Sequence, residues 1–216
     1  MKSGDKNTKE RILEEALKLF SQNGYMGTSM SDIAAELGVT KAALYKHYSS
    51  KQEILDSIIE RMNQLDAERV RAYAMPEGDM EDVIAAYRNT DFDKIREFTR
   101  VQFLHWTEEE FPCRFRRMLT LEQYRDPAMA ALYQKYLAEG PLSYMEILFA
   151  GMTGQVTDAR QLALDFYGSI FLLYSIRDGM ENPQDAIEIL DSHVGQFAAR
   201  LQKSQHGVES GQDSEP

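Results

Sequence analysis

Side chains suited to reading DNA bases are concentrated in one short segment that begins at Lys41. Lys41 and Lys46 carry ammonium groups that can donate to guanine or to phosphate oxygens. Ala42 and Ala43 are short enough to let a backbone approach a base edge, and their methyl groups can contact thymine methyls. The alternative is that these two alanines are simply good helix formers. If the segment is helical and these residues face outward, it predicts a helix that enters the major groove of double-stranded DNA.

Polar side chains around this segment are suited to phosphate rather than to bases. Contacts of this kind fix the register of a protein on DNA without reading its sequence. We expect the backbone-contacting set, including residues at helix amino ends, to be Thr28, Ser29, Thr40, Tyr45 and Lys51. His47 is open to two interpretations, a phosphate contact or a solvated surface histidine.

Two short helices joined by a tight turn are predicted to hold these residues. Apolar periodicity indicates helices at 30–37 and 41–47, with a turn through Gly38-Val39-Thr40 between them. Glycine permits the positive φ angle that such a reversal needs. The residues expected to lock the two helices at a fixed angle are Ile33, Ala34, Leu37, Val39 and Leu44. This layout is that of a helix-turn-helix.

Helical periodicity continues through nearly all of the chain without a convincing alternating strand pattern, which predicts an all-α fold. A helix at 9–23 precedes the two short helices and completes an N-terminal three-helix unit. Ser50 and Glu53 are spaced as a capping box that opens a long helix. Gly140-Pro141 predicts a kink or break in a later helix.

The stretch from Thr28 to Leu55 resembles the DNA-binding domain of TetR/AcrR-type repressors, and the resemblance extends back through the helix at 9–23. The motif consists, in order, of Ile33-Ala34, Gly38-Val39, Leu44-Tyr45 and Lys51-x-x-Ile54-Leu55. Tyr48 departs from the family, which more often has Phe there, but it should fill the same core position. The resemblance implies an Ω-shaped homodimer whose last two helices form a four-helix bundle between subunits. It also implies an effector that moves the helix starting near Lys51 and releases the operator.

The predicted domains are a helix-turn-helix DNA-binding domain at 1–50, a larger helical effector-binding and dimerisation domain at 51–203, and a disordered tail at 204–216. The helices near 160–178 and 183–202 carry more apolar surface than one side of a short helix needs, which predicts a two-fold homodimer. Candidate contributors to that dimer are Phe166, Ile170, Tyr174, Leu190, Val194 and Phe197. The sequence leaves open which of these face inward and which face the partner.

Aromatic residues are dense between roughly 90 and 175, together with a few polar side chains, a mixture typical of small-molecule pockets. The candidate contacts to an apolar or aromatic effector are Phe98, Gln102, His105, Trp106, Tyr124, Tyr144, Phe166 and Tyr167. The competing interpretation is that these rings only fill a core. An alternative function also stays open, that of a DNA-bound regulator whose carboxy-terminal domain recognises a protein partner.

The net charge of −11 is unevenly distributed. Residues 1–55 carry eight basic and seven acidic side chains, and the rest of the chain carries sixteen and twenty-eight. A near-neutral head permits DNA contact, whereas the acidic remainder repels DNA. There is no nucleophile–base pair, phosphate loop or metal-ligand spacing, so we expect no enzyme activity, metal or cofactor. A polar amino terminus, the absence of a membrane-length apolar run and the single cysteine, Cys113, predict a cytoplasmic protein.

Overall fold

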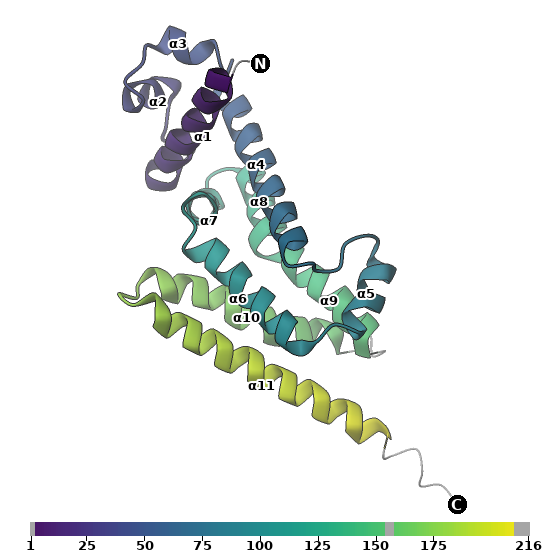
Figure 1. Ribbon diagram of the computed structural model, residues 1–216. Coiled ribbons are helices and arrows are strands. Elements are labelled where there is room, and N and C mark those ends of the chain that lie inside the picture. Colours follow the sequence, from purple (N-terminus) through teal and green to yellow (C-terminus); the bar gives the residue numbers. More distant parts are fainter. Residues whose placement is uncertain (1–2, 154–157, 210–216) are drawn as a thin grey trace, which may run out of the picture. The chain divides into compact units, whose positions relative to one another are not determined.

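The computed structural model describes residues 3–153 and 158–209, and within these ranges every regular element is an α-helix (Figure 1). This confirms the predicted all-α class. In the described part of the chain, no helix is both long and apolar enough to cross a membrane.

The chain divides into two compact units. The first contains the chain up to Ala72 together with Glu108–Gln134, and the second contains Tyr73–Thr107 together with the chain from Lys135 onward. These units are defined by contacts in space and each is discontinuous in sequence. The functional boundary predicted at residue 50 stays a prediction.

The first unit is built on a long amino-terminal helix. Its elements are α1 (Ser3–Asn23), α2 (Met30–Glu36), α3 (Lys41–Tyr45), α4 (Lys51–Ala72), α7 (Glu110–Glu122) and the first part of α8 (Pro127–Leu137). α1 packs against α2, α4 and α7, and α2 packs against α3. Fully buried side chains such as Phe20, Ile33 and Leu44 form its core, as the apolar periodicity of the sequence requires.

The second unit is centred on its helix at Ala159–Asp178, which has apolar residues on several sides. Its elements are α5 (Met80–Arg88), α6 (Phe92–Thr107), the end of α8, α9 (Glu139–Thr153), α10 (Ala159–Asp178) and α11 (Pro183–Glu209). α10 contacts α6, α9 and α11, and α5 packs on α9. Aromatic pairs fill the interior: the rings of Phe103 and Tyr174 stack 5.6 Å apart, and those of Phe166 and Phe197 lie 4.9 Å apart.

Local sequence signals explain where several helices begin and end. The predicted break at Gly140-Pro141 is confirmed, because α8 ends at Leu137 and Pro141 lies in the first turn of α9, where its missing N–H costs least. The predicted capping box is half formed. Ser50 Oγ accepts from the backbone N–H of Glu53 at 3.1 Å, but the Glu53 carboxylate accepts from the N–H of Ser49 at 2.6 Å.

The predicted disordered tail requires a correction. α11 continues to Glu209, so residues 204–209 are helical, and residues 210–216 lie outside the described residues. The composition of the tail is polar, but it contains no proline before the final residue. Gly207 alone costs a helix only about 1 kcal/mol relative to alanine, which is too little to end it.

Candidate nucleic-acid interface

A reciprocal cap fixes the start of α2. The Ser29 hydroxyl oxygen accepts from the N–H of Asp32 at 3.2 Å, and the Asp32 carboxylate accepts from the Ser29 N–H and hydroxyl, each at 2.7 Å. These donors hold the pKa of Asp32 below its usual value. Ser29, predicted to contact DNA, therefore lies exposed at the helix amino end with its hydroxyl already hydrogen-bonded.

The turn between α2 and α3 has the geometry that its sequence predicts. Gly38 has φ +67°, and the N–H of Val39 donates to the carbonyl of Ala34 at 2.9 Å. Thr40 caps α3, since its hydroxyl oxygen accepts from the N–H of Ala43 at 3.2 Å. The prediction that Val39 locks the two helices is wrong, because the turn leaves its side chain 44% exposed.

The outward side of α3 carries the predicted base-reading residues. Lys41, Ala42, Tyr45 and Lys46 are exposed, while Ala43 and His47 are half-buried. The helix is held from below by Leu44, which is fully buried. The Lys41 ammonium lies 5.9 Å from the centre of the Tyr45 ring, so one basic and one aromatic residue occupy the same exposed patch.

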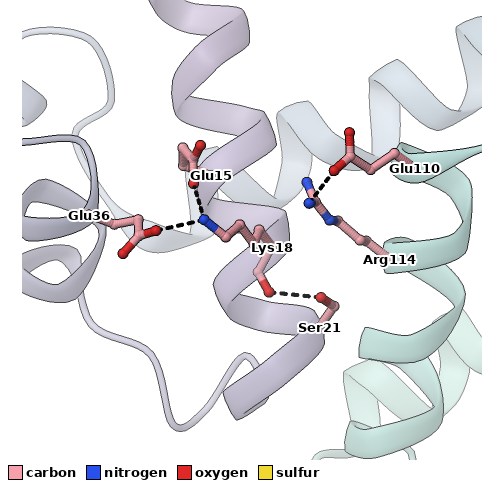
Figure 2. A network of polar contacts seen from close by, with 6 residues as sticks. All are labelled: Glu15, Lys18, Ser21, Glu36, Glu110 and Arg114. Carbon is pink, nitrogen blue, oxygen red and sulfur yellow. Dashed lines mark hydrogen bonds and ion pairs between the residues drawn. The ribbon is translucent and has the colours of Figure 1, made fainter.

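An ion pair between helices joins the helix-turn-helix to α1 (Figure 2). Lys18 of α1 donates to Glu36 at the end of α2 at 2.6 Å and to Glu15 at 3.1 Å. The hydrogen bond to Glu36 is the main reason why the pKa of Lys18 is raised. Sequence reasoning missed this pair because eighteen residues separate its members and no local spacing connects them.

Two predicted phosphate ligands interact with the turn that connects α1 to α2, Thr28 as part of it and Lys51 through its ammonium group. Thr28 is buried, and its hydroxyl donates to the carbonyl of Gly24 at 2.9 Å, so its prediction as a side-chain phosphate contact requires correction. Lys51, at the start of α4, is half-buried and donates to the carbonyls of Tyr25 at 2.6 Å and Thr28 at 2.7 Å. Burial lowers the pKa of Lys51. An ammonium group has three donors, so these two carbonyls leave one.

The predicted effector residues do not all come together. Seven of the eight lie in the second unit: His105, Trp106, Phe166 and Tyr167 are buried, and Phe98, Gln102 and Tyr144 are half-buried. Tyr124 requires a correction, because it belongs to the first unit and is 90% exposed. α7 ends at Glu122, and the turn before α8 points this side chain into solvent.

Several of the buried aromatic residues already have partners inside the second unit. The Phe166 ring lies 5.9 Å from that of Phe149, and the Tyr167 hydroxyl donates to the carbonyl of Leu137 at 2.7 Å. Burial raises the pKa of both Tyr87 and Tyr144, whose hydroxyls interact. These contacts fit a packed core as well as they fit the wall of a pocket.

Two clefts are lined by other residues. One, of about 80 Å³, lies in the first unit between α1 and the helix-turn-helix, beside Val39 and His47. The other, of about 460 Å³, is an open groove on the outer side of α10 and α11, beside Leu172 and His193. Neither contains any of the eight predicted effector residues.

The outer side of α10 and α11 carries exposed apolar residues. On α10, Leu164, Leu172 and Ile176 are separated by multiples of four residues and are 44%, 59% and 42% exposed, and Ile189 of α11 is 49% exposed. Spacing by four places the α10 residues on one side of the helix. The sequence left open which of the six candidate residues face inward and which face a partner, and all six lie buried inside the unit.

Comparison with known proteins supports the interpretation of the amino-terminal part. Residues 12–58 match the model of the family of bacterial regulatory proteins called tetR. IcaR of Staphylococcus epidermidis, a negative transcriptional regulator of a biofilm operon, is 42% identical over 52 residues, which is 24% of this chain and 28% of IcaR. The matched part thus spans little more than a quarter of that relative.

Solved structures extend the likeness to the whole fold. A TetR/AcrR-family regulator from Thermobifida fusca YX-ER1 is 21% identical with a TM-score of 0.53, over 87% of this chain and 96% of that one. AibR, solved in complex with isovaleryl coenzyme A and operator DNA, is 24% identical with a TM-score of 0.59, over 87% and 96%. At these identities the likeness concerns the fold alone. Residues 12–58 are therefore a tetR-family domain, in a chain whose fold solved TetR-family regulators share.

Proposed function

We propose that the protein is a transcriptional repressor that binds a pseudo-palindromic DNA operator as a homodimer. The observation that carries the proposal is the exposed side of α3, which carries Lys41, Ala42 and Tyr45, with Lys46 as its C-cap, while Leu44 anchors the other side. Two ammonium groups flanking small side chains suit close approach to base edges in a major groove. Such a function would place the protein in the cytoplasm, with the chromosome.

The two-fold homodimer is the second part of the proposal. One subunit has a single α3 to place in a major groove, and a symmetric dimer has two. An operator with two half-sites requires two. The exposed apolar residues of α10 and α11 support this part, because a row of large apolar side chains on one surface is typical of an interface. We assign Leu164, Leu172, Ile176 and Ile189 to that interface.

The DNA-binding proposal is tested by selecting binding sites from a random DNA library and then measuring variants on the selected site. Lys46→Ala should lose preference at particular base positions, by roughly 1–3 kcal/mol each. Lys135→Ala removes the same charge from an exposed position of α8 that belongs to the second unit, and serves as the control. A wild-type protein that enriches no sequence would refute the function, and equal effects of the two variants would refute the role of α3.

We further propose that a small apolar or aromatic effector releases the operator. The support is the aromatic content of the second unit and the fact that AibR, a protein of the same fold, binds isovaleryl coenzyme A. Coupling between two ligands is reciprocal. If the inducer weakens operator binding by a given factor, the operator must weaken inducer binding by the same factor. Titration of candidate compounds with and without operator measures this factor. A failure of apolar compounds to raise the melting temperature would favour the protein-partner alternative.

A further inference from the structure

The carboxylate of Glu122 has an unusual position at the end of α7. The residue is fully buried, and among the described residues its Oε2 atom has no hydrogen-bond partner. Its Oε1 atom lies 3.4 Å from the guanidinium of Arg125, a side chain that is more than half exposed. Burial of a carboxylate with so few donors costs free energy unless a nearby positive charge compensates it.

The same carboxylate lies directly against the turn that follows α1. A Cβ atom built on Gly24 would be 2.0 Å from Glu122 Oε1, so only a glycine lets the carboxylate approach this closely. Gly24 also has φ +82°, a conformation that other residues adopt only at a cost. The carbonyl of Gly24 accepts from the buried hydroxyl of Thr28, which closes the turn.

Lys51 connects this carboxylate to the start of the helix-turn-helix. Its ammonium holds the carbonyls of Tyr25 and Thr28, and it lies 4.3 Å from the centre of the Tyr25 ring. Burial lowers the pKa of Lys51, and attraction to Glu122 and, more weakly, to Asp32 opposes that effect. Thr28 is followed at once by Ser29, the cap of α2, so the position of this turn sets where the helix-turn-helix begins.

We propose that Glu122 is a positioning residue for DNA binding, whose buried carboxylate holds Lys51 and the turn of residues 24–28 in the geometry that presents α3 to DNA. The inference rests on the proposed DNA-binding function. This role would explain why the fold keeps a buried charge, since that charge fixes the position of the helix-turn-helix. Glu122 itself is fully buried, so the proposed role is indirect, through Lys51 and the turn.

The test is Glu122→Gln, which keeps the shape of the side chain and removes its charge. Operator affinity should fall roughly tenfold, which corresponds to about 1.4 kcal/mol. The dependence of affinity on salt should keep its slope, since no phosphate contact is lost. The melting temperature should change little, because Lys51 keeps its hydrogen bonds to the carbonyls of Tyr25 and Thr28. Glu110→Gln makes the same charge change at an exposed position of α7 and should leave affinity unchanged.

A second measurement shows whether the effect passes through Lys51. The pKa of the Lys51 ammonium, followed by NMR, should fall in E122Q and stay constant in E110Q. In a Lys51→Met background, E122Q should weaken operator binding less than it does in the wild type. A lower melting temperature or unfolding of E122Q would overturn the proposal, because it would show that Glu122 serves stability. An E122Q variant that binds operator with the affinity of the wild type would overturn it as well. If the wild-type protein binds no DNA, the proposed function fails. An unchanged Lys51 pKa in E122Q would separately refute the electrostatic attraction between Glu122 and Lys51.

Discussion

Leu172 offers a quantitative test of the proposed dimer. Full burial of a leucine side chain contributes roughly 1.5–3 kcal/mol, and the 59% of Leu172 that is still exposed therefore represents roughly 1–2 kcal/mol. A two-fold interface contains the residue twice, which doubles the effect. Because alanine keeps one methyl group, Leu172→Ala should weaken the dimer by roughly 2–3 kcal/mol, or roughly 30- to 150-fold in its dissociation constant.

Sedimentation velocity over a dilution series measures this constant directly. Leu121→Ala is the matched control, because Leu121 is 40% exposed but lies on α7 in the first unit. The L172A variant should dissociate at concentrations where the wild type and L121A remain dimers. A wild-type protein that is monomeric at micromolar concentration would refute the dimer, and equal dissociation constants for the two variants would refute the assignment to α10.

Two further predictions concern the helix turns and an ion pair of the second unit. Gly38→Ala should lower the free energy of unfolding by roughly 1–2 kcal/mol, because it forces alanine to a positive φ in open space, and Gly24→Ala should cost more, because it also displaces the Glu122 carboxylate. Urea denaturation of both variants measures their free energies of unfolding. The prediction is refuted if G38A loses as much stability as G24A. Hydrogen bonds from Arg160, then from Ser143, lower the pKa of Glu139 to about 2. The stabilising effect of that pair is therefore complete above the usual glutamate pKa and is lost as the pH falls toward 2. A carboxyl titration by NMR in which Arg160→Ala leaves this pKa unchanged would contradict the assignment.

Much of the helix-turn-helix could be predicted from sequence because its signals are local. The Ser29 cap closes on a residue three positions away, Gly38 needs only its own freedom in φ, and Thr40 caps α3 through Ala43. The Gly140-Pro141 break has the same local origin. Interactions within one turn of backbone depend little on the rest of the chain, so residue types and spacing are enough to place them.

What the tertiary structure decided are the contacts between residues far apart in sequence. The residues around Lys51 in the sequence predict a phosphate ligand, yet its ammonium donates to two carbonyls more than twenty residues away. Glu122 lies against the turn at Gly24, almost a hundred residues earlier in the chain. No periodicity or motif connects such positions, because their proximity results from the packing of α7 against α1.

The sequence also could not distinguish the inward face of α10 from its outward face. Phe166 and Ile170 point inward and Leu164 and Leu172 point outward, so the helix is apolar on both sides. Apolar periodicity identifies a core face only when the opposite face is polar. The sequence alone therefore determined that this helix has surplus apolar surface, and only the packing of α6, α9 and α11 around it decided which residues remain for a partner.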